Sequence, residues 1–187
     1  MTPNEIGRGP SRLHQVAARV EDTAWLDAPV RVVDMVLPDA IRSGPARDVL
    51  GGRWLGHAAH PMLTDFPLGM WMSASLLDLL PGDHRAASRR LLVGGLLGAL
   101  PTVATGWSDW TMAGPRERRV GVVHALTNVC AAALYARSLA ARRADRHGAG
   151  VVLGLAGGLT AIVGGFLGGH LSTDRGVAVR SSADVNS

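Results

Sequence analysis

The sequence lacks most of what soluble enzymes and disulfide-linked secreted domains depend on. Its single cysteine, Cys130, lies inside an apolar segment, which excludes an internal disulfide framework and a cysteine-ligated zinc or iron–sulfur site. It has no Gly-x-Ser-x-Gly motif, no glycine-rich phosphate loop ending in Lys-Ser or Lys-Thr, and no His-Glu-x-x-His pair. A stand-alone hydrolase or kinase is therefore not expected.

Charge is also scarce. Charged residues make up 18% of the 187 residues, and lysine is absent, so all 19 basic residues are arginine. The net charge of +4 does not indicate a nucleic-acid partner, because the arginines lie mostly between apolar segments, where membrane topology explains them. The first twenty residues contain no continuous apolar run of the kind found in signal peptides. We expect the membrane segments themselves to direct insertion.

Long apolar runs are what the sequence has in abundance. Each is close to the roughly 20 residues that a helix needs to cross about 30 Å of hydrocarbon. The segments between them are short, polar and rich in arginine, and tryptophans near their boundaries resemble interfacial anchors. The predicted membrane helices are residues 61–80, 91–110, 120–140 and 151–171.

These helices define the expected domain organisation. The fold class is all-α, an integral membrane bundle of four antiparallel transmembrane helices with an N-terminal helical arm. The transmembrane domain covers residues 56–175, the polar and partly helical arm covers 1–55, and a flexible tail covers 176–187. No internal repeat is apparent in the sequence. Glycines at small-xxx-small spacing, such as Gly94 with Gly98, predict close helix packing inside the monomer.

Polar side chains concentrate at one end of the predicted bundle. In an antiparallel arrangement the first and third helices begin where the second and fourth helices end. Ionisable groups within a membrane are unfavourable by a few kcal/mol unless they face the interior and find partners. The residues that meet at this end are His57, His60, Asp65, Asp109, His124, Asn128 and His170.

The deep histidines have two main interpretations. His124 and His170 can ligate a haem b or a transition metal through neutral imidazole nitrogens, with His60 and His57 as further candidate ligands. Alternatively, the histidines only form hydrogen bonds between helices, or they relay protons. The sequence leaves these interpretations open.

Other polar residues at this end have supporting roles under the cofactor hypothesis. Asp65 and Asn128 would orient the ligating imidazoles, although Asp65 is equally explained as an ion-pair partner. Asp109, beside two tryptophans, is explained by a solvated helix end. The arginines at positions 116, 118 and 119 would contact haem propionates at the interface.

Five ordered motifs carry a family resemblance. They are Gly-His-Ala-Ala-His-Pro-Met-Leu at 56–63, Asp-Phe-Pro-Leu-Gly at 65–69, Thr-Gly-Trp-Ser-Asp-Trp at 105–110, Val-His-Ala-Leu-Thr-Asn at 123–128 and Leu-Gly-Gly-His-Leu at 167–171. Over about residues 50–179 the chain resembles DUF2231, a family of bacterial four-helix integral membrane proteins of unknown function. The family usually has proline where Ala58 stands. The resemblance implies an electron-transfer partner, because some relatives are linked to a Rieske-type iron–sulfur domain; here that partner would be a separate chain.

The leading functional hypothesis is therefore a multi-pass membrane subunit that binds haem or a metal and transfers electrons with a separate redox protein. The alternatives are a proton or small-solute transport module, and a non-catalytic membrane anchor whose histidines are structural. The lipid bilayer is the expected partner, in the bacterial cytoplasmic (inner) membrane with cytosolic termini, and a homo-oligomer is compatible with the sequence. Arginine counts of eight and seven on the two sides do not decide the orientation.

Overall fold

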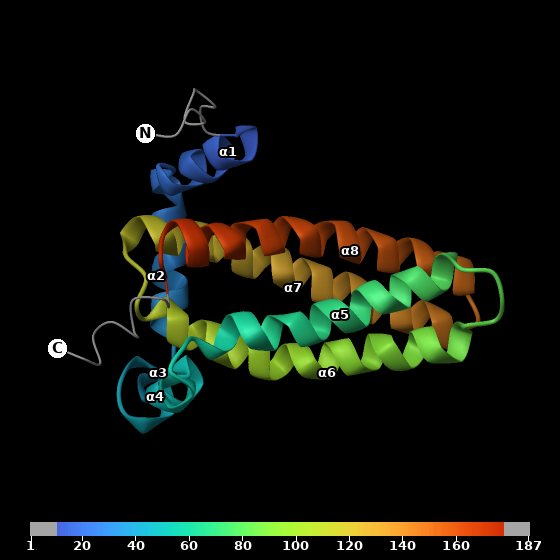
Figure 1. Ribbon diagram of the computed structural model, residues 1–187. Helices are drawn as coiled ribbons and strands as arrows, with labels where there is room; N and C mark the ends of the chain where they lie inside the picture. The colour runs from blue at the N-terminus through green and yellow to red at the C-terminus, as the bar shows by residue number, and fades with distance from the viewer. Residues whose placement is uncertain (1–10, 178–187) are drawn as a thin grey trace, which may run out of the picture.

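The computed structural model describes residues 11–177, and within this range every regular element is helical. The four long helices are α5 (Ala59–Leu79), α6 (Arg85–Trp110), α7 (Pro115–Arg143) and α8 (His147–Gly169). Successive helices run in opposite directions along one bundle axis (Figure 1). The predicted all-α fold is confirmed. Residues 1–10 of the arm and 178–187 of the tail lie outside the described range.

Three of the long helices, α6, α7 and α8, are long and apolar enough to cross a membrane. Helix α5 does not belong to this group, and its composition gives the reason, because it contains His60, Asp65 and Asp78 within 21 residues. The helices also extend past the predicted boundaries; α6 begins at Arg85 and α7 at Pro115. Arginine and alanine in these flanks favour helix.

The four helices form a closed ring of contacts. Helix α5 packs on α6, α6 on α7, α7 on α8, and α8 on α5. Helices α5 and α7 therefore lie diagonally opposite each other across the bundle axis, as do α6 and α8. Side chains that reach the axis from α5 meet side chains from α7.

Glycines allow each helical hairpin to pack closely. A Cβ atom added to Gly95 of α6 would lie 2.3 Å from Nε1 of Trp71, and one added to Gly98 would lie 2.4 Å from Cδ1 of Phe66. In the second hairpin, an added Cβ at Gly157 of α8 would lie 3.2 Å from Tyr135. Large side chains of α5 and α7 thus occupy space left by glycines of α6 and α8. The small-residue spacing contributes to packing within the monomer.

The proline inside α5 has a defined consequence. Pro67 has no backbone N–H, so the carbonyl of Leu63 loses its helical donor. The hydroxyl of Thr102 in α6 donates to this carbonyl at 3.1 Å. The carbonyl group freed by Pro67 thus accepts a hydrogen bond from α6, which joins the two helices of the hairpin.

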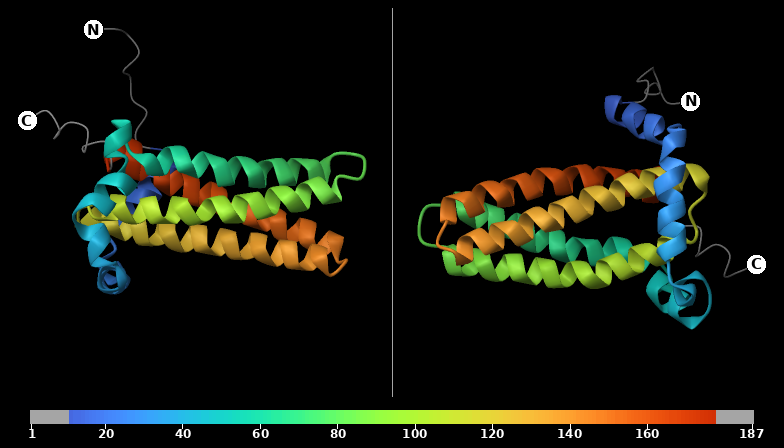
Figure 2. Two further views of the ribbon diagram at one scale, coloured as in Figure 1. Left: turned by 90° about the horizontal axis from the view of Figure 1, so that it is seen from below. Right: turned by 180° about the vertical axis from the view of Figure 1, so that it is seen from behind.

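The arm consists of short helices at the end of the bundle where α5 begins. They are α1 (Arg12–Glu21), α2 (Asp27–Val36), α3 (Asp39–Arg42) and α4 (Pro45–Gly51), joined by 3₁₀ turns at Ala24–Leu26 and Arg53–Leu55. Helix α2 runs across the bundle rather than along it in Figure 1 and in the right-hand view of Figure 2. A π-type turn at His170–Asp174 follows α8 at the same end.

Candidate functional site: a histidine pair on the bundle axis

His60 of α5 and His124 of α7 face each other across the bundle axis. Their ring centroids lie 6.2 Å apart and the rings are nearly perpendicular. Both residues are half-buried, near the end of the bundle that carries the arm. The structure thus brings together two of the four predicted ligand histidines, from diagonally opposed helices.

Each imidazole is held through the same nitrogen. Nδ1 of His60 lies 2.8 Å from the carbonyl oxygen of Thr102, and Nδ1 of His124 lies 2.8 Å from that of Gly164. A carbonyl oxygen only accepts, so Nδ1 carries the proton in both rings and Nε2 of the neutral imidazole keeps its lone pair. Metal-ligating histidines are oriented in this way by carbonyl acceptors.

Glycines make room for both rings. A Cβ added to Gly106 of α6 would lie 3.0 Å from Cε1 of His60, and one added to Gly168 of α8 would lie 2.9 Å from Cε1 of His124. Each glycine follows the carbonyl that its histidine contacts by four residues, or one helical turn. Larger residues at these positions would push the imidazoles away from their carbonyl partners.

The predicted supporting residues have different positions. The amide nitrogen of Asn128 lies 3.1 Å from Nε2 of His124, so Asn128 donates to the remaining lone pair. Asp65 is exposed on the outer surface of α5 rather than directed at a histidine, and His57 is exposed with Nδ1 3.1 Å from the neighbouring carbonyl of Ala58. Asp109 is 8% exposed, and its Oδ1 has no hydrogen-bond partner among residues 11–177.

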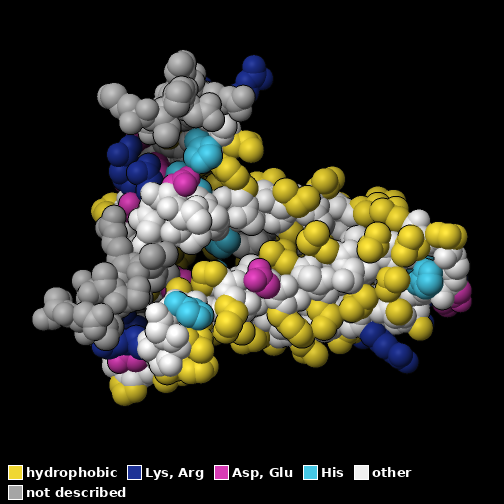
Figure 3. Space-filling view, in the orientation of Figure 1, with side chains coloured by type: hydrophobic (Ala, Val, Ile, Leu, Met, Phe, Trp, Pro, Cys, Tyr) yellow, Lys and Arg dark blue, Asp and Glu magenta, His cyan; other side chains and the backbone are white. Residues whose placement is uncertain are grey.

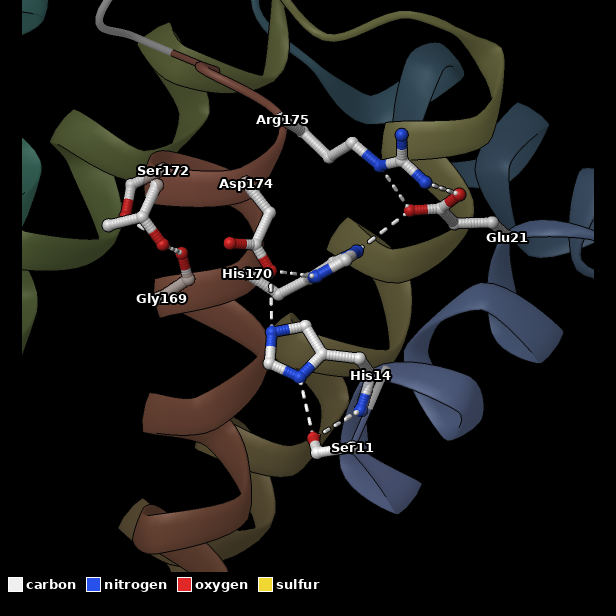
Figure 4. A network of polar contacts seen from close by, with 9 residues as sticks. Ser11, His14, Glu21, Gly169, His170, Ser172, Asp174 and Arg175 are labelled. Atoms are coloured by element: carbon white, nitrogen blue, oxygen red, sulfur yellow. Dashed lines mark hydrogen bonds and ion pairs between the residues drawn. The ribbon is translucent and has the colours of Figure 1, made fainter. Parts of the chain in front are cut away.

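His170 takes part in a separate network that joins α8 to the arm (Figure 4). Its Nε2 lies 2.8 Å from Oε1 of Glu21, and its Nδ1 lies 2.8 Å from Oδ2 of Asp174. His14 of α1 contacts the same Asp174 oxygen at 3.1 Å. Both nitrogens of His170 face carboxylate oxygens, so neither offers a lone pair to a metal while these contacts persist.

Glu21 is the central residue of this network, and its side chain is fully buried. Arg175 donates from Nε to Oε1 at 2.6 Å and also pairs with Oε2. Burial raises the pKa of Glu21, but the hydrogen bonds from Arg175 and His170 outweigh it, and the net effect is a lowered pKa. The same pairing raises the pKa of Arg175. Glu21 is therefore a carboxylate at neutral pH.

The arginines at the start of α7 also bind the arm. Arg119 makes a bidentate pair with Asp27, at 2.7 and 2.9 Å, which lowers the pKa of that carboxyl group. Arg118 lies 3.3 Å from Oδ2 of Asp34, and Arg116 pairs with Asp22. These three arginines were expected to contact haem propionates. Here they hold the arm against α7 instead.

Further pairs of residues meet across the axis between α5 and α7. Trp71 stacks on Tyr135 with ring centroids 4.4 Å apart, and Asp78 accepts from Nη1 of Arg142 at 2.7 Å. The members of the histidine, aromatic and ionic pairs are each separated by 64 residues, and the carbonyls that hold the two histidines are 62 residues apart. The α5–α6 and α7–α8 hairpins are thus related by a pseudo-twofold axis along the bundle, and the histidine pair lies on it.

The ionic pair at the far end of this axis was missed by the sequence analysis. The side chain of Asp78 is 4% exposed and that of Arg142 is 1% exposed. Ser88 donates to Asp78 at 2.9 Å, and Nε of Arg142 donates to Ser138 at 3.1 Å. Asp78 and Arg142 occupy corresponding positions of the two hairpins, but no sequence identity marks this relation.

The largely apolar flank of the bundle is visible in Figure 3, with most charged side chains toward its ends and one acidic side chain on the flank itself. Together with three helices able to cross a bilayer, it defines the class: a multi-pass helical membrane protein. Residues 56–181 match the model of the family described as "Predicted membrane protein (DUF2231)", and the chain belongs to that family. Neither a curated protein nor a solved structure matches the chain.

Proposed function

We propose that this protein is a membrane electron-transfer subunit in which His60 and His124 would hold the iron of a haem b, and in which α5 is a fourth span. The observation that carries the proposal is the histidine pair on the bundle axis, with each Nδ1 held by a carbonyl oxygen; within residues 11–177, Nε2 of His124 accepts a hydrogen bond only from the Asn128 side chain. The proposal replaces His170 with His60 as the partner of His124.

The donor set favours haem over a bare metal ion. Within residues 11–177 no group of three or more His, Cys, Asp or Glu side chains is arranged to hold a metal ion. A porphyrin supplies four ligands itself and needs two from the protein, one on each face. Two metal–nitrogen bonds of about 2 Å, together with the dimensions of two imidazoles, place the ring centroids about 6 Å apart, which agrees with the 6.2 Å separation.

The chemistry that haem supplies when bound is reversible one-electron transfer. The protein fixes both imidazole orientations through the carbonyl groups of Thr102 and Gly164. Asn128, which donates to Nε2 of His124, must turn away when that nitrogen binds iron. Asn128 therefore satisfies the imidazole in the absence of a ligand.

The position of the pair suits exchange with a separate redox protein. Gly106, which packs against His60, lies four residues, or about 6 Å, from the end of α6 at Trp110. The site is thus close to the membrane face that carries the arm and both described ends of the chain (Figure 1). We assign this face to the cytosol of a bacterial inner membrane, because a polar, charged arm is more easily retained than translocated.

A transport function has less support. The aromatic stack of Trp71 and Tyr135 and the buried pair of Asp78 and Arg142 occupy the bundle axis, where a path for solutes would run. Asp65, which motivated the transport hypothesis, lies on the outer surface. The anchor hypothesis is favoured by the ion pairs of the arm, but it gives no reason for two imidazoles oriented toward each other.

A reduced-minus-oxidised visible spectrum tests the proposal. We expect His60→Ala and His124→Ala to abolish or strongly shift the haem absorption of purified protein, and His170→Ala to leave it in place. Loss of absorption only in His170→Ala would contradict the assignment. Circular dichroism of each variant shows whether the helices remain formed.

A further inference from the structure

Within residues 11–177, the arm has a face that neither the bundle nor another part of the arm covers. The inner face of α2 is well packed, since Leu37 joins a buried cluster with Trp110 and Val122, and Val30 and Val33 pack against that cluster. Val122 lies seven residues, or about 10 Å, along α7 from Pro115. Helix α2 therefore lies against the side of the bundle, at the depth where the membrane-crossing helices leave the bilayer.

The outer face of α2 is apolar and exposed. Val32, Met35 and Val36 are 54%, 75% and 64% exposed, and Arg31 lies on the same face. Such a face is costly in water, because burying apolar surface is worth about 25 cal/mol per Å². An amphipathic helix with an arginine beside its apolar residues is typical of helices that lie in a membrane interface.

Helix α1 continues this surface. Leu13 and Val16 are 59% and 50% exposed, whereas Ala17 and Glu21 of the same helix are buried. Trp25, in the turn between α1 and α2, is 74% exposed. Tryptophan is enriched at membrane–water boundaries, where its ring sits among the headgroups.

The neighbouring flank of the bundle identifies what covers this face. Beyond the contacts of α2, the membrane-crossing helices expose apolar residues to lipid; on α6, Val103 is 50% exposed, and on α7, Leu126 and Val129 are 61% and 63% exposed. Helix α2 packs on Trp110 and Val122 at one end of the same bundle, and its outer face is apolar like this flank. Helix α2 runs across the side of the bundle rather than along it, as the right-hand view of Figure 2 shows.

Charge supports the same assignment. Asp22, Asp27 and Asp34 of the arm are paired with arginines of α7, and the outward apolar face of α2 carries Arg31 instead. We propose that the arm is an interfacial membrane element, with Val32, Met35 and Val36 inserted among acyl chains and Arg31 at the level of the lipid phosphates. The partner of this surface is the bilayer that holds the bundle. The proposal does not depend on a haem being bound.

Nitroxide accessibility in vesicles of phosphatidylcholine and phosphatidylglycerol tests this assignment. The full-length protein is labelled at Met35→Cys or Val16→Cys in a Cys130→Ala background, and collisions with oxygen and with a water-soluble nickel chelate are measured. Native Cys130, which is exposed on α7, provides the lipid reference, and Asp83→Cys, in the polar loop before α6, provides the water reference.

We expect the oxygen-to-nickel ratio at positions 16 and 35 to approach that at Cys130 and to exceed that at position 83. A ratio at both positions equal to that at position 83 would show an arm in water and overturn the proposal. Low accessibility to both reagents would show a protein contact, and would equally overturn it. The two labelled positions lie on different helices, so the second position still tests the proposal if one variant does not fold.

Discussion

The buried pair of Asp78 and Arg142 gives the sharpest prediction about stability. Both side chains are almost completely buried, and the guanidinium group donates to Asp78 at 2.7 Å and to the hydroxyl groups of Ser88 and Ser138 at 3.1 Å. Replacing Asp78 with leucine leaves a buried cation with only neutral partners. Breaking a buried ion pair by removing one member costs about 3–5 kcal/mol. We expect a loss of unfolding free energy in that range.

Removing both charges should lower the free energy of unfolding much less than removing one of them. In the double variant Asp78→Leu with Arg142→Met, no uncompensated charge remains, and apolar replacements of buried ion pairs are often neutral. Ser88 keeps its hydrogen bond to the carbonyl of Ala74, at 3.3 Å. The interaction free energy in a double-mutant cycle should therefore be roughly 3 kcal/mol or more.

Equilibrium unfolding in mixed detergent micelles, followed by circular dichroism, measures these differences. Arg137→Met is the matched control, because Arg137 lies on the same helix but is exposed. It should change the unfolding free energy by less than about 0.5 kcal/mol. The reasoning is refuted if Asp78→Leu costs no more than this control, or if the double variant costs the sum of the single variants.

Three further predictions concern the site and the arm. Lowering the pH should release the arm, because the pKa of Glu21 is lowered in the folded state. The stability that the Glu21 carboxylate contributes is complete above its ordinary pKa of 4.5 and is lost as the pH falls through the lowered pKa. Hydrogen exchange of α1 should therefore rise in acid, and Glu21→Gln should flatten this pH dependence. Gly168→Ala should lower the free energy of unfolding by about 1–3 kcal/mol, because the added Cβ would lie 2.9 Å from the ring of His124. It should also weaken haem binding, measured by haem titration. Gly165→Ala is the control and should be neutral, because there is open space at its Cβ. Asp65→Asn should preserve the haem spectrum and raise the thermal unfolding temperature, because it removes an exposed carboxylate from an otherwise apolar surface; an unchanged or lower temperature would contradict this account.

Much of the fold could be predicted from apolar segments alone. Their lengths and the polar segments between them identify the long helices, and glycine spacing indicates where the helices approach closely. Helix α5 is the weakest case, because His60, Asp65 and Asp78 interrupt its apolar character. Two of these polar residues, His60 and Asp78, are directed inward and contact α7.

The site could be predicted only in part, because pairing depends on contacts between distant segments. Antiparallel topology correctly gathers the histidines at one end, but it does not reveal that His60 is the residue opposite His124. His170 contacts Glu21, a residue of the polar arm 149 positions away. No motif in the sequence indicates that the Glu21 carboxylate is the partner of His170. The pseudo-twofold relation is hidden because, apart from the two histidines, the paired residues differ: tryptophan faces tyrosine, and aspartate faces arginine.

The central claim, that His60 and His124 together bind haem iron, is tested most directly by electron paramagnetic resonance of the oxidised protein. Purified from cells supplied with a haem precursor, the wild-type protein should give the low-spin ferric signal of iron with two imidazole ligands, since the two rings are already opposed at 6.2 Å. Replacing either histidine with alanine should convert this signal to high spin or remove it. A wild-type protein with no ferric haem signal, or one whose low-spin signal survives both substitutions, would contradict the account.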